Sequence, residues 1–340
     1  MKFIIISFLL LVFSPSISTI QIDSEKTNSL NLSEIAESVT PIPLDKKVGG
    51  IQDIFVADNY IFLAGISSVI QCTTSGKIIR QIITDGAVND ISGDVQQKRI
   101  FVTVGSSIEC YDFSGKLMKK YPLKHNGCCS YLFNNTLWVC SFNSTASDVQ
   151  HHFSYFDLQT EKEIFIPFDI HEKLDKTRFT LDGGQFTSYG NKLYYSTPYR
   201  NIIYTVTKDN ITPSTQWEIT PEIPVDEQFC FSCKSGHLGK YTLINYSKKD
   251  TKSMFFRFYT YLKDTKTNKT HQVITDREYG LYLNGIRDDV FNSGYLYIDR
   301  GLNNEGYFCY IKERSEIKGD KVGDIPVKNG PVIFIVKVKN

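Results

Sequence analysis

The sequence predicts an all-β fold, a six-bladed β-propeller whose four-stranded antiparallel blades stand around a central channel. From residue 32 to the end, short alternating runs of apolar residues are separated by Gly, Asn, Asp and Ser, and no long segment has a helical apolar period. The chain also repeats itself at a spacing of about 39 residues, close to the roughly 40–50 residues of a propeller blade.

The repeat is clearest in the first two units. Ile61-Phe62 aligns with Ile100-Phe101, and the tripeptide Ser-Gly-Lys around Gly76 recurs around Gly115. We interpret each tripeptide as a hairpin turn in which the glycine takes a positive φ, because glycine has no Cβ to oppose that conformation. The repeat argues against a large β-sandwich, which is the competing all-β fold.

Four further units follow more loosely, so the whole chain supplies six. A ring of blades avoids an open edge when its last blade combines strands from both ends of the chain. We therefore expect residues 39–44 to complete the blade that contains residues 332–338.

The amino terminus predicts a secretory signal peptide over residues 1–18. Lys2 precedes an apolar run over residues 3–13, and small serines follow before the expected cleavage. An uncleaved anchor is the alternative, but the run is short for a bilayer span of about 20 residues. We expect a flexible segment over residues 19–31 and the propeller over residues 32–340. The protein is then exported, to the periplasm or cell surface, with no transmembrane segment after signal removal.

Charge and size limit the classes of partner. The 340 residues include 38 Lys and Arg against 37 Asp and Glu, a net charge of +1. No basic surplus is present to neutralise phosphates, so we expect no nucleic-acid partner. We expect a monomer whose partner is a glycan, a peptide or an envelope protein.

Eight cysteines permit disulfides in an exported chain but do not require them. Cys230 and Cys233 form a Cys-x-x-Cys on an expected strand, where residues three apart face opposite sides and are poorly placed to share a metal. The other six lie in or beside apolar segments. We expect buried free thiols, with one or two disulfides as the alternative, and no metal or cofactor.

Several segments together resemble a known family. They are residues 33–44, the two Ser-Gly-Lys units, residues 194–204, Asp288-Asp289 after Gly285, and residues 330–337. In these the chain resembles the exported six-bladed propeller proteins common in Bacteroidetes, loosely related to NHL-type propellers. It departs from many of them in lacking a lipoprotein cysteine and in carrying Asp85-Gly86-Ala87 where they have a Gly-Pro-Gly-Glu-like turn. The resemblance implies a fold rather than a function.

Catalytic motifs are missing from the sequence. It has no Gly-x-Ser-x-Gly, His-Glu-x-x-His, P-loop or dinucleotide fingerprint, so we predict no catalytic residue and lean away from an enzyme. The candidate ligand-binding residues are Tyr199, Arg200, Arg287, Asp288 and Asp289. Tyr199 would stack on a ring and Arg200 would hold a carboxylate. The two aspartates would face a polar ligand or cation, or else cap exposed N–H groups of a turn.

Two further aromatic features have a structural interpretation that we favour. Trp138 is expected in the core of its blade rather than on a binding face. His151 and His152, as neighbours on a strand, should face opposite ways and form a surface pair rather than a metal site.

The function we expect is a non-catalytic binding propeller, with a ligand held by loops at one end of the channel. A propeller lyase or hydrolase, whose site is assembled from separate blades, is the alternative, and a protein scaffold is a third. Several titratable groups converging at the channel would favour the enzyme.

Overall fold

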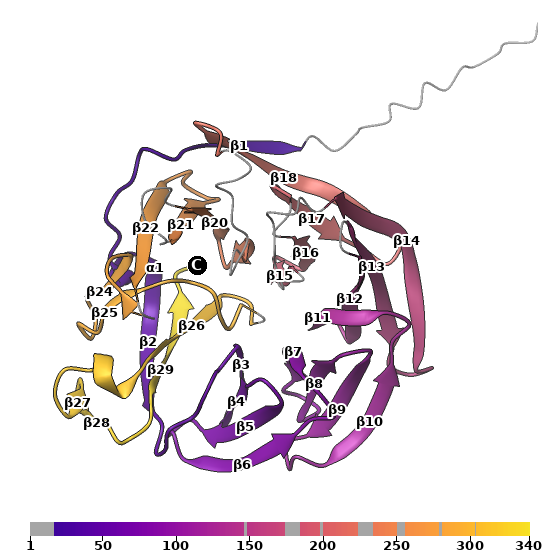
Figure 1. Cartoon of the computed structure of the whole chain (residues 1–340), viewed down its shortest axis with the longest axis horizontal. Coiled ribbons are helices and arrows are strands. Elements are labelled where there is room, and N and C mark those ends of the chain that lie inside the picture. The colour runs from indigo at the N-terminus through magenta and orange to yellow at the C-terminus, as the bar shows by residue number, and fades with distance from the viewer. Residues whose placement is uncertain are drawn as a thin grey trace, which may run out of the picture.

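The computed structural model confirms the six-bladed propeller (Figure 1). It describes residues 17–145, 148–173, 184–197, 200–223, 234–249, 256–278, 281–302 and 304–340. Blade 1 contains β3 (Asp53–Val56), β4 (Tyr60–Ala64), β5 (Ser68–Thr73) and β6 (Ile78–Ile83). Blade 2 contains β7 (Val88–Asp94), β8 (Arg99–Val104), β9 (Ser107–Asp112) and β10 (Leu117–Pro122). Blade 3 contains β11 (Asn126–Phe133), β12 (Thr136–Ser144), β13 (Asp148–Asp157) and β14 (Lys162–Lys173).

The next two blades carry one extra strand each. Blade 4 contains β15 (Gln185–Tyr189), β16 (Lys192–Ser196), β17 (Ile202–Val206), β18 (Ile211–Thr220) and, parallel to β18, β1 (Ser18–Asp23). Blade 5 contains β19 (Gly236–Leu238), β20 (Tyr241–Lys249), β21 (Phe256–Asp264), β22 (Thr270–Glu278) and the short β23 (Leu281–Tyr282).

Blade 6 closes the ring as the sequence predicts. Its three paired strands are β26 (Tyr307–Lys312), β29 (Val332–Val338) and β2 (Ala36–Pro43). The innermost segment runs beside β26 and pairs with it through one bridge, Arg300 to Cys309. The amino-terminal strand β2 thus lies antiparallel to β29, the last strand of the chain, and this pairing closes the ring between the two chain ends.

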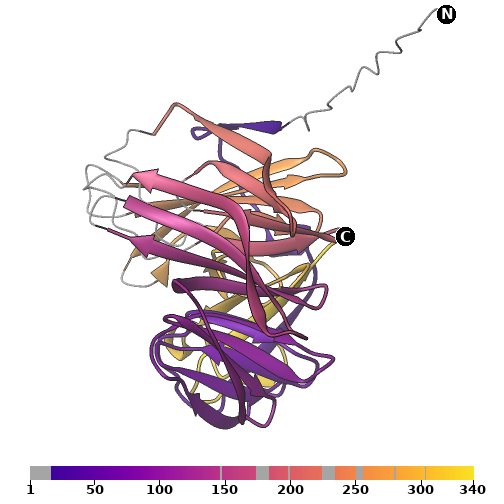
Figure 2. The same ribbon diagram turned by 90° about the vertical axis from the view of Figure 1, so that its right-hand side faces the viewer.

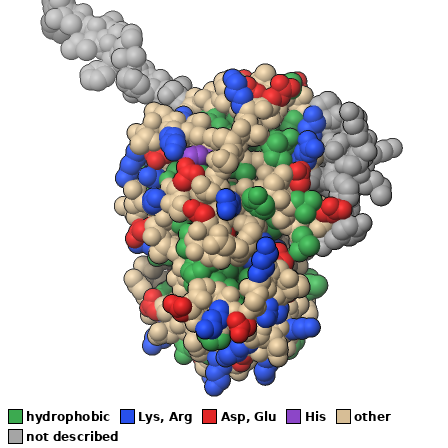
Figure 3. Space-filling view, turned by 90° about the vertical axis from the view of Figure 1, so that its left-hand side faces the viewer, with side chains coloured by type: hydrophobic (Ala, Val, Ile, Leu, Met, Phe, Trp, Pro, Cys, Tyr) green, Lys and Arg blue, Asp and Glu red, His purple; other side chains and the backbone are tan. Residues whose placement is uncertain are grey.

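Short elements cover the outer side of blade 6. They are the helices α1 (Leu32–Ile35) and η2 (Arg314–Glu316) and the hairpins β24 (Ile286–Asp288) with β25 (Gly294–Leu296) and β27 (Lys321–Val322) with β28 (Ile325–Pro326). On this side of the molecule, Lys and Arg side chains are interspersed with Asp and Glu (Figure 3).

The amino-terminal segment forms a belt, residues 18–43, over blades 4, 5 and 6. After β1, Asn28 exchanges two hydrogen bonds with Gln272 of β22, and the Leu30 carbonyl accepts from the Arg287 N–H before α1 and β2 follow. Figure 2 shows β1 along the outer rim of the ring. The structure here differs from the flexible segment expected over residues 19–31, because alternate residues of β1 enter the core: Ile20 and Ile22 are buried.

Apolar packing joins each blade to the next. Six clusters of buried side chains among the described residues lie one at each blade interface. Because both faces of a blade are covered, central strands such as β8 have consecutive buried residues rather than alternation. Trp138 is buried in the cluster between blades 3 and 4, as expected.

The turn glycines and the cysteines agree with their predictions. Gly76 and Gly115 have φ values of 82° and 78°. A Cβ on Gly76 would lie 2.0 Å from the Pro43 carbonyl oxygen of β2, so the turn needs glycine for space as well as for conformation. The described cysteines are all buried thiols, namely Cys72, Cys110, Cys128, Cys129, Cys140 and Cys309. Cys230 and Cys233 lie outside the described residues.

Candidate functional site

Charged side chains from four blades converge where the innermost strands begin. Asp53 is the first residue of β3 in blade 1, and Asp90 is the third residue of β7 in blade 2. Lys234 precedes β19 of blade 5 by two residues, and Asp299 and Arg300 lie in the innermost segment of blade 6. We call these five residues the channel cluster.

Asp53 is the hub of the channel cluster. Its Oδ2 lies 3.1 Å from the Lys234 Nζ, although the two residues are 181 positions apart in sequence. Its Oδ1 accepts from its neighbour, the Ile54 N–H, at 2.7 Å and from the Gly301 N–H at 2.9 Å. One carboxylate thereby connects blades 1, 5 and 6.

Asp90 lies close to this hub, and its buried carboxyl group keeps its proton to a higher pH than an exposed one would. Its Oδ2 accepts from the Ser130 N–H of blade 3 at 2.8 Å. Burial and the negative charge of Asp53 together raise the pKa of Asp90 to about 8, against the opposing charge of Lys234. The carboxyl group can therefore donate a hydrogen bond as well as accept one.

The charges of the channel cluster balance. Arg300 Nη1 lies 3.7 Å from Asp299 Oδ1, which adds a second cation and anion to the Lys234–Asp53 pair. With Asp90 protonated, the formal charges of the five residues sum to zero. The cluster reaches solvent through Lys234 and Arg300, whose side chains are 22% and 23% exposed.

The residues singled out from the sequence do not come together. Tyr199 lies outside the described residues. Arg200 joins blade 3 to blade 4, since its Nη2 donates to the His171 carbonyl at 3.1 Å and its Nη1 lies 3.2 Å from the Tyr204 hydroxyl. Arg287, Asp288 and Asp289 lie at β24 on the outer side of blade 6, away from blade 4 (Figure 1).

The carboxylates of the Asp288-Asp289 pair are engaged in structural hydrogen bonds. Asp288 is buried and accepts from the N–H groups of Val290 and Phe291, and from the Tyr310 hydroxyl at 2.9 Å. Asp289 accepts from the Ser33 N–H at 2.9 Å. This arrangement matches the turn-capping interpretation of the pair and attaches α1 to blade 6.

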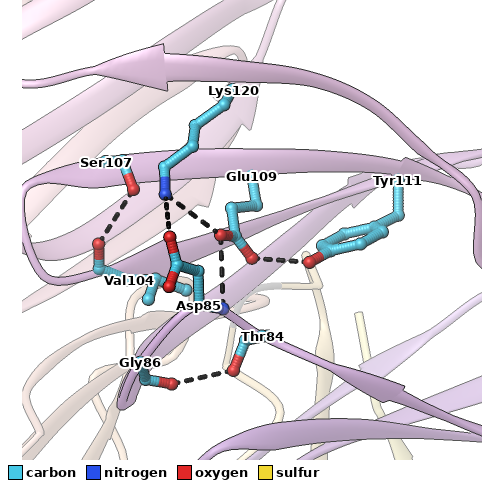
Figure 4. Close-up of polar contacts among 8 residues, drawn as sticks. All are labelled: Thr84, Asp85, Gly86, Val104, Ser107, Glu109, Tyr111 and Lys120. Atoms are coloured by element: carbon cyan, nitrogen blue, oxygen red, sulfur yellow. Dashed lines mark hydrogen bonds and ion pairs between the residues drawn. The ribbon is translucent and has the colours of Figure 1, made fainter.

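A second buried polar group lies between blades 1 and 2 (Figure 4). Glu109 is 1% exposed, accepts from the Tyr111 hydroxyl at 2.5 Å and lies 3.5 Å from the Lys120 Nζ. Lys120 also pairs with Asp85 at 2.8 Å, a hydrogen bond that lowers the pKa of that carboxyl. Asp85 belongs to the Asp85-Gly86-Ala87 turn, so this group anchors the connection between two blades.

Sequence reasoning missed Asp53, Asp90 and Lys234. One signal could have found the two aspartates: each directly precedes a fully buried isoleucine, Ile54 or Ile91, at the innermost strand of its blade. An acidic residue at that place in two successive repeats indicates a polar channel wall. Lys234 has no such signal, because nothing in the sequence around it indicates that its side chain contacts Asp53 of blade 1.

Comparison with known proteins identifies the family. The family model described as "Domain of unknown function (DUF4934)" matches residues 17–331. The chain belongs to this family. Among curated proteins, none matches this DUF4934 member.

One solved structure supports the same architecture for this DUF4934 member. A Bacteroides fragilis NCTC 9343 structure, described as a "Putative exported protein", aligns with a TM-score of 0.64 at 12% identity, covering 96% of this chain and 100% of that one. A Bacteroides thetaiotaomicron VPI-5482 protein of unknown function aligns with a TM-score of 0.48 at 11% identity, covering 92% and 75%. The resemblance to exported six-bladed propeller proteins of Bacteroidetes is confirmed. Within the described ranges, no helix has the length and apolar character of a membrane span.

Proposed function

We propose that the protein is an exported, non-catalytic binding propeller that holds a neutral polar ligand at the channel cluster. The observation that carries this proposal is the charge balance of the channel cluster, in which the Lys234–Asp53 and Arg300–Asp299 pairs leave no net charge for a ligand to neutralise. Propellers bind ligands where loops and innermost strands surround the axis.

Stability alone does not account for these charges. Removing an ion pair from water costs several kcal/mol per ion, and apolar residues of similar volume often give equal or greater stability. Six apolar interfaces already hold the blades together. The charges at the channel therefore favour a role in recognition.

The chemistry of the cluster favours hydroxyl groups. A charged ligand would leave an uncompensated charge in a cluster that sums to zero, whereas a neutral ligand would not. Sugar hydroxyls both donate and accept, so they can bond to the Asp53 carboxylate and to the Lys234 and Arg300 donors. A glycan therefore fits better than a charged peptide or a flat protein surface.

A thermal-shift screen against neutral glycans and against peptides tests the proposal. We expect a glycan to raise the melting temperature of the wild-type protein, and Lys234→Ala to abolish that rise. Lys240→Ala is the matched control, because Lys240 forms a 3.1 Å pair with Asp264 in the same blade without belonging to the channel cluster. Equal loss of binding in both variants, or a response to peptides alone, would contradict the glycan proposal.

A propeller hydrolase or lyase is the second candidate, and the convergence of titratable groups in the channel cluster favours it. Asp90, whose burial raises its pKa, lies beside the Asp53 carboxylate that is paired with Lys234, so the two could serve as the acid and the base of general acid–base catalysis. Turnover of a stabilising glycan by the wild type, lost in Asp90→Asn, would replace the binding role by catalysis. Stabilisation without turnover would retain the binding role.

A further inference from the structure

Three cysteine sulfurs meet inside blade 3. The Sγ atoms of Cys128 and Cys129 on β11 and of Cys140 on β12 all lie within 4.8 Å of one another. Neighbours on a regular strand point to opposite faces, but the β11–β12 register shifts between Gly127 and Cys129. A bulge of this kind sets two residues of one strand against one residue of its partner, so both cysteines oppose Cys140.

A histidine lies beside the group, next to Cys140. His151 on β13 lies diagonally across from Cys140, whose direct partner is Phe153, and so it shares the same face of the blade. The His151 Nδ1 lies 3.6 Å from the Cys140 Sγ. The Tyr195 hydroxyl, from β16 of blade 4, lies 3.3 Å from each of those two atoms. The expected surface pair is wrong for His151, which is 1% exposed.

We propose that Cys128, Cys129, Cys140 and His151 form a buried Cys₃His site for Zn²⁺. Tetrahedral zinc with its usual bond lengths separates a sulfur from a nitrogen by about 3.5 Å and two sulfurs by about 3.8 Å. The 3.6 Å distance between the Cys140 Sγ and the His151 Nδ1 already fits. The sulfurs need to approach one another by at most about 1 Å, and the His151 ring must move closer to the cysteines of β11.

The grouping distinguishes these cysteines from the other described ones. Cys72, Cys110 and Cys309 lie in the apolar interfaces of other blades and belong to no such group. Simple core thiols have no reason to gather beside an imidazole, whereas soft thiolate and imidazole ligands are the set that zinc takes.

Binding involves no change of oxidation state. Each thiol loses its proton, three S–Zn bonds and one N–Zn bond form, and three protons leave to solvent. The Tyr195 hydroxyl stays within reach of the Cys140 sulfur and can donate to it. With four protein ligands no position is left for water, so the site is structural: it joins β11, β12 and β13 beside the interface with blade 4.

Zinc content measures the proposal directly. The full chain is produced with Zn²⁺ under reducing conditions, dialysed against a weak chelator and analysed by elemental mass spectrometry. We expect about one zinc per chain in the wild type and in Cys110→Ser, a matched buried cysteine, and at least a tenfold lower content in Cys140→Ser. A wild type without zinc, or a disulfide joining two of the three cysteines, would overturn the proposal.

A spectroscopic measurement covers the case in which Cys140→Ser does not fold. Protein produced with Co²⁺ in place of Zn²⁺ should show the thiolate-to-cobalt charge-transfer absorption of a tetrahedral site, with an intensity that reports three sulfurs. Absence of that absorption from the wild-type protein would refute the site without reference to any variant.

Discussion

Replacing Asp90 by asparagine should remove a large pH dependence from the stability of this protein. Burial and the Asp53 charge raise the pKa of Asp90 from 3.8 to about 8. Above pH 3.8 the unfolded chain loses this proton while the folded chain keeps it, so the folded state loses stability as the pH rises towards 8. The stabilisation is complete below pH 3.8 and gone above the folded pKa.

The size of the effect follows from the two pKa values. Each pH unit within the window changes the free energy of unfolding by about 1.4 kcal/mol, so the wild type should lose about 4 kcal/mol between pH 5 and pH 8.5 through this group. Asp90→Asn carries no titrating carboxyl. Between pH 5 and pH 8.5, the free energy of unfolding of Asp90→Asn relative to that of the wild type should therefore rise by about 4 kcal/mol.

Urea unfolding of both proteins across pH 5 to 8.5 measures this difference, and groups that titrate alike in both proteins cancel. Lys234→Met supplies a second check: Lys234 lowers the pKa of Asp90, so its removal should move the upper end of the window to higher pH. Parallel stability curves for the wild type and Asp90→Asn would refute the reasoning.

Three further predictions concern the ring itself. Gly115→Ala should lower the free energy of unfolding by about 1–2 kcal/mol because of its positive φ. Gly76→Ala should lower it further, because its Cβ would meet a backbone oxygen of β2 rather than a flexible side chain. Equal losses of stability in urea unfolding would contradict this. Ile42→Ala, in the closing strand, should cost about 2–5 kcal/mol, while exposed Ile83→Ala should stay within about 0.5 kcal/mol. The six buried cysteines should resist iodoacetamide in the folded protein and react after unfolding, as peptide mass spectrometry would show.

The propeller could be predicted from the sequence because its blades repeat and most paired strands are neighbours in the chain. Each hairpin turn, such as the one at Gly76, lies between strands that are neighbours in the chain, and the repeat then fixes the number of blades. Closure by β2 also followed from a general need, since an open sheet edge invites pairing with other chains. The strand β1 was missed, although Ile20 and Ile22 alternate with polar residues as a half-buried strand does.

The candidate site could not be found in the same way, because its members are brought together only by the ring. Lys234 and Asp53 meet across 181 residues of sequence, and no local pattern encodes that contact. Asp288 stood out as part of an acidic pair with Asp289, yet its carboxylate accepts hydrogen bonds from the backbone N–H groups of its own turn. The cysteine group was hidden by the rule that strand neighbours face apart, which a single bulge at Cys128 breaks.

The belt imposes an order on folding. β1 and β2 are the first described strands to be synthesised, but their partners, β18 and β29, come from the fourth blade and from the last strand of the chain. Blades 1 to 3 can assemble from consecutive residues while the chain is still emerging, whereas the amino-terminal strands must wait for partners that do not yet exist. The pairing of β2 with β29 must therefore wait until the end of the chain has been synthesised. A product truncated before residue 332 would leave β2 without its partner.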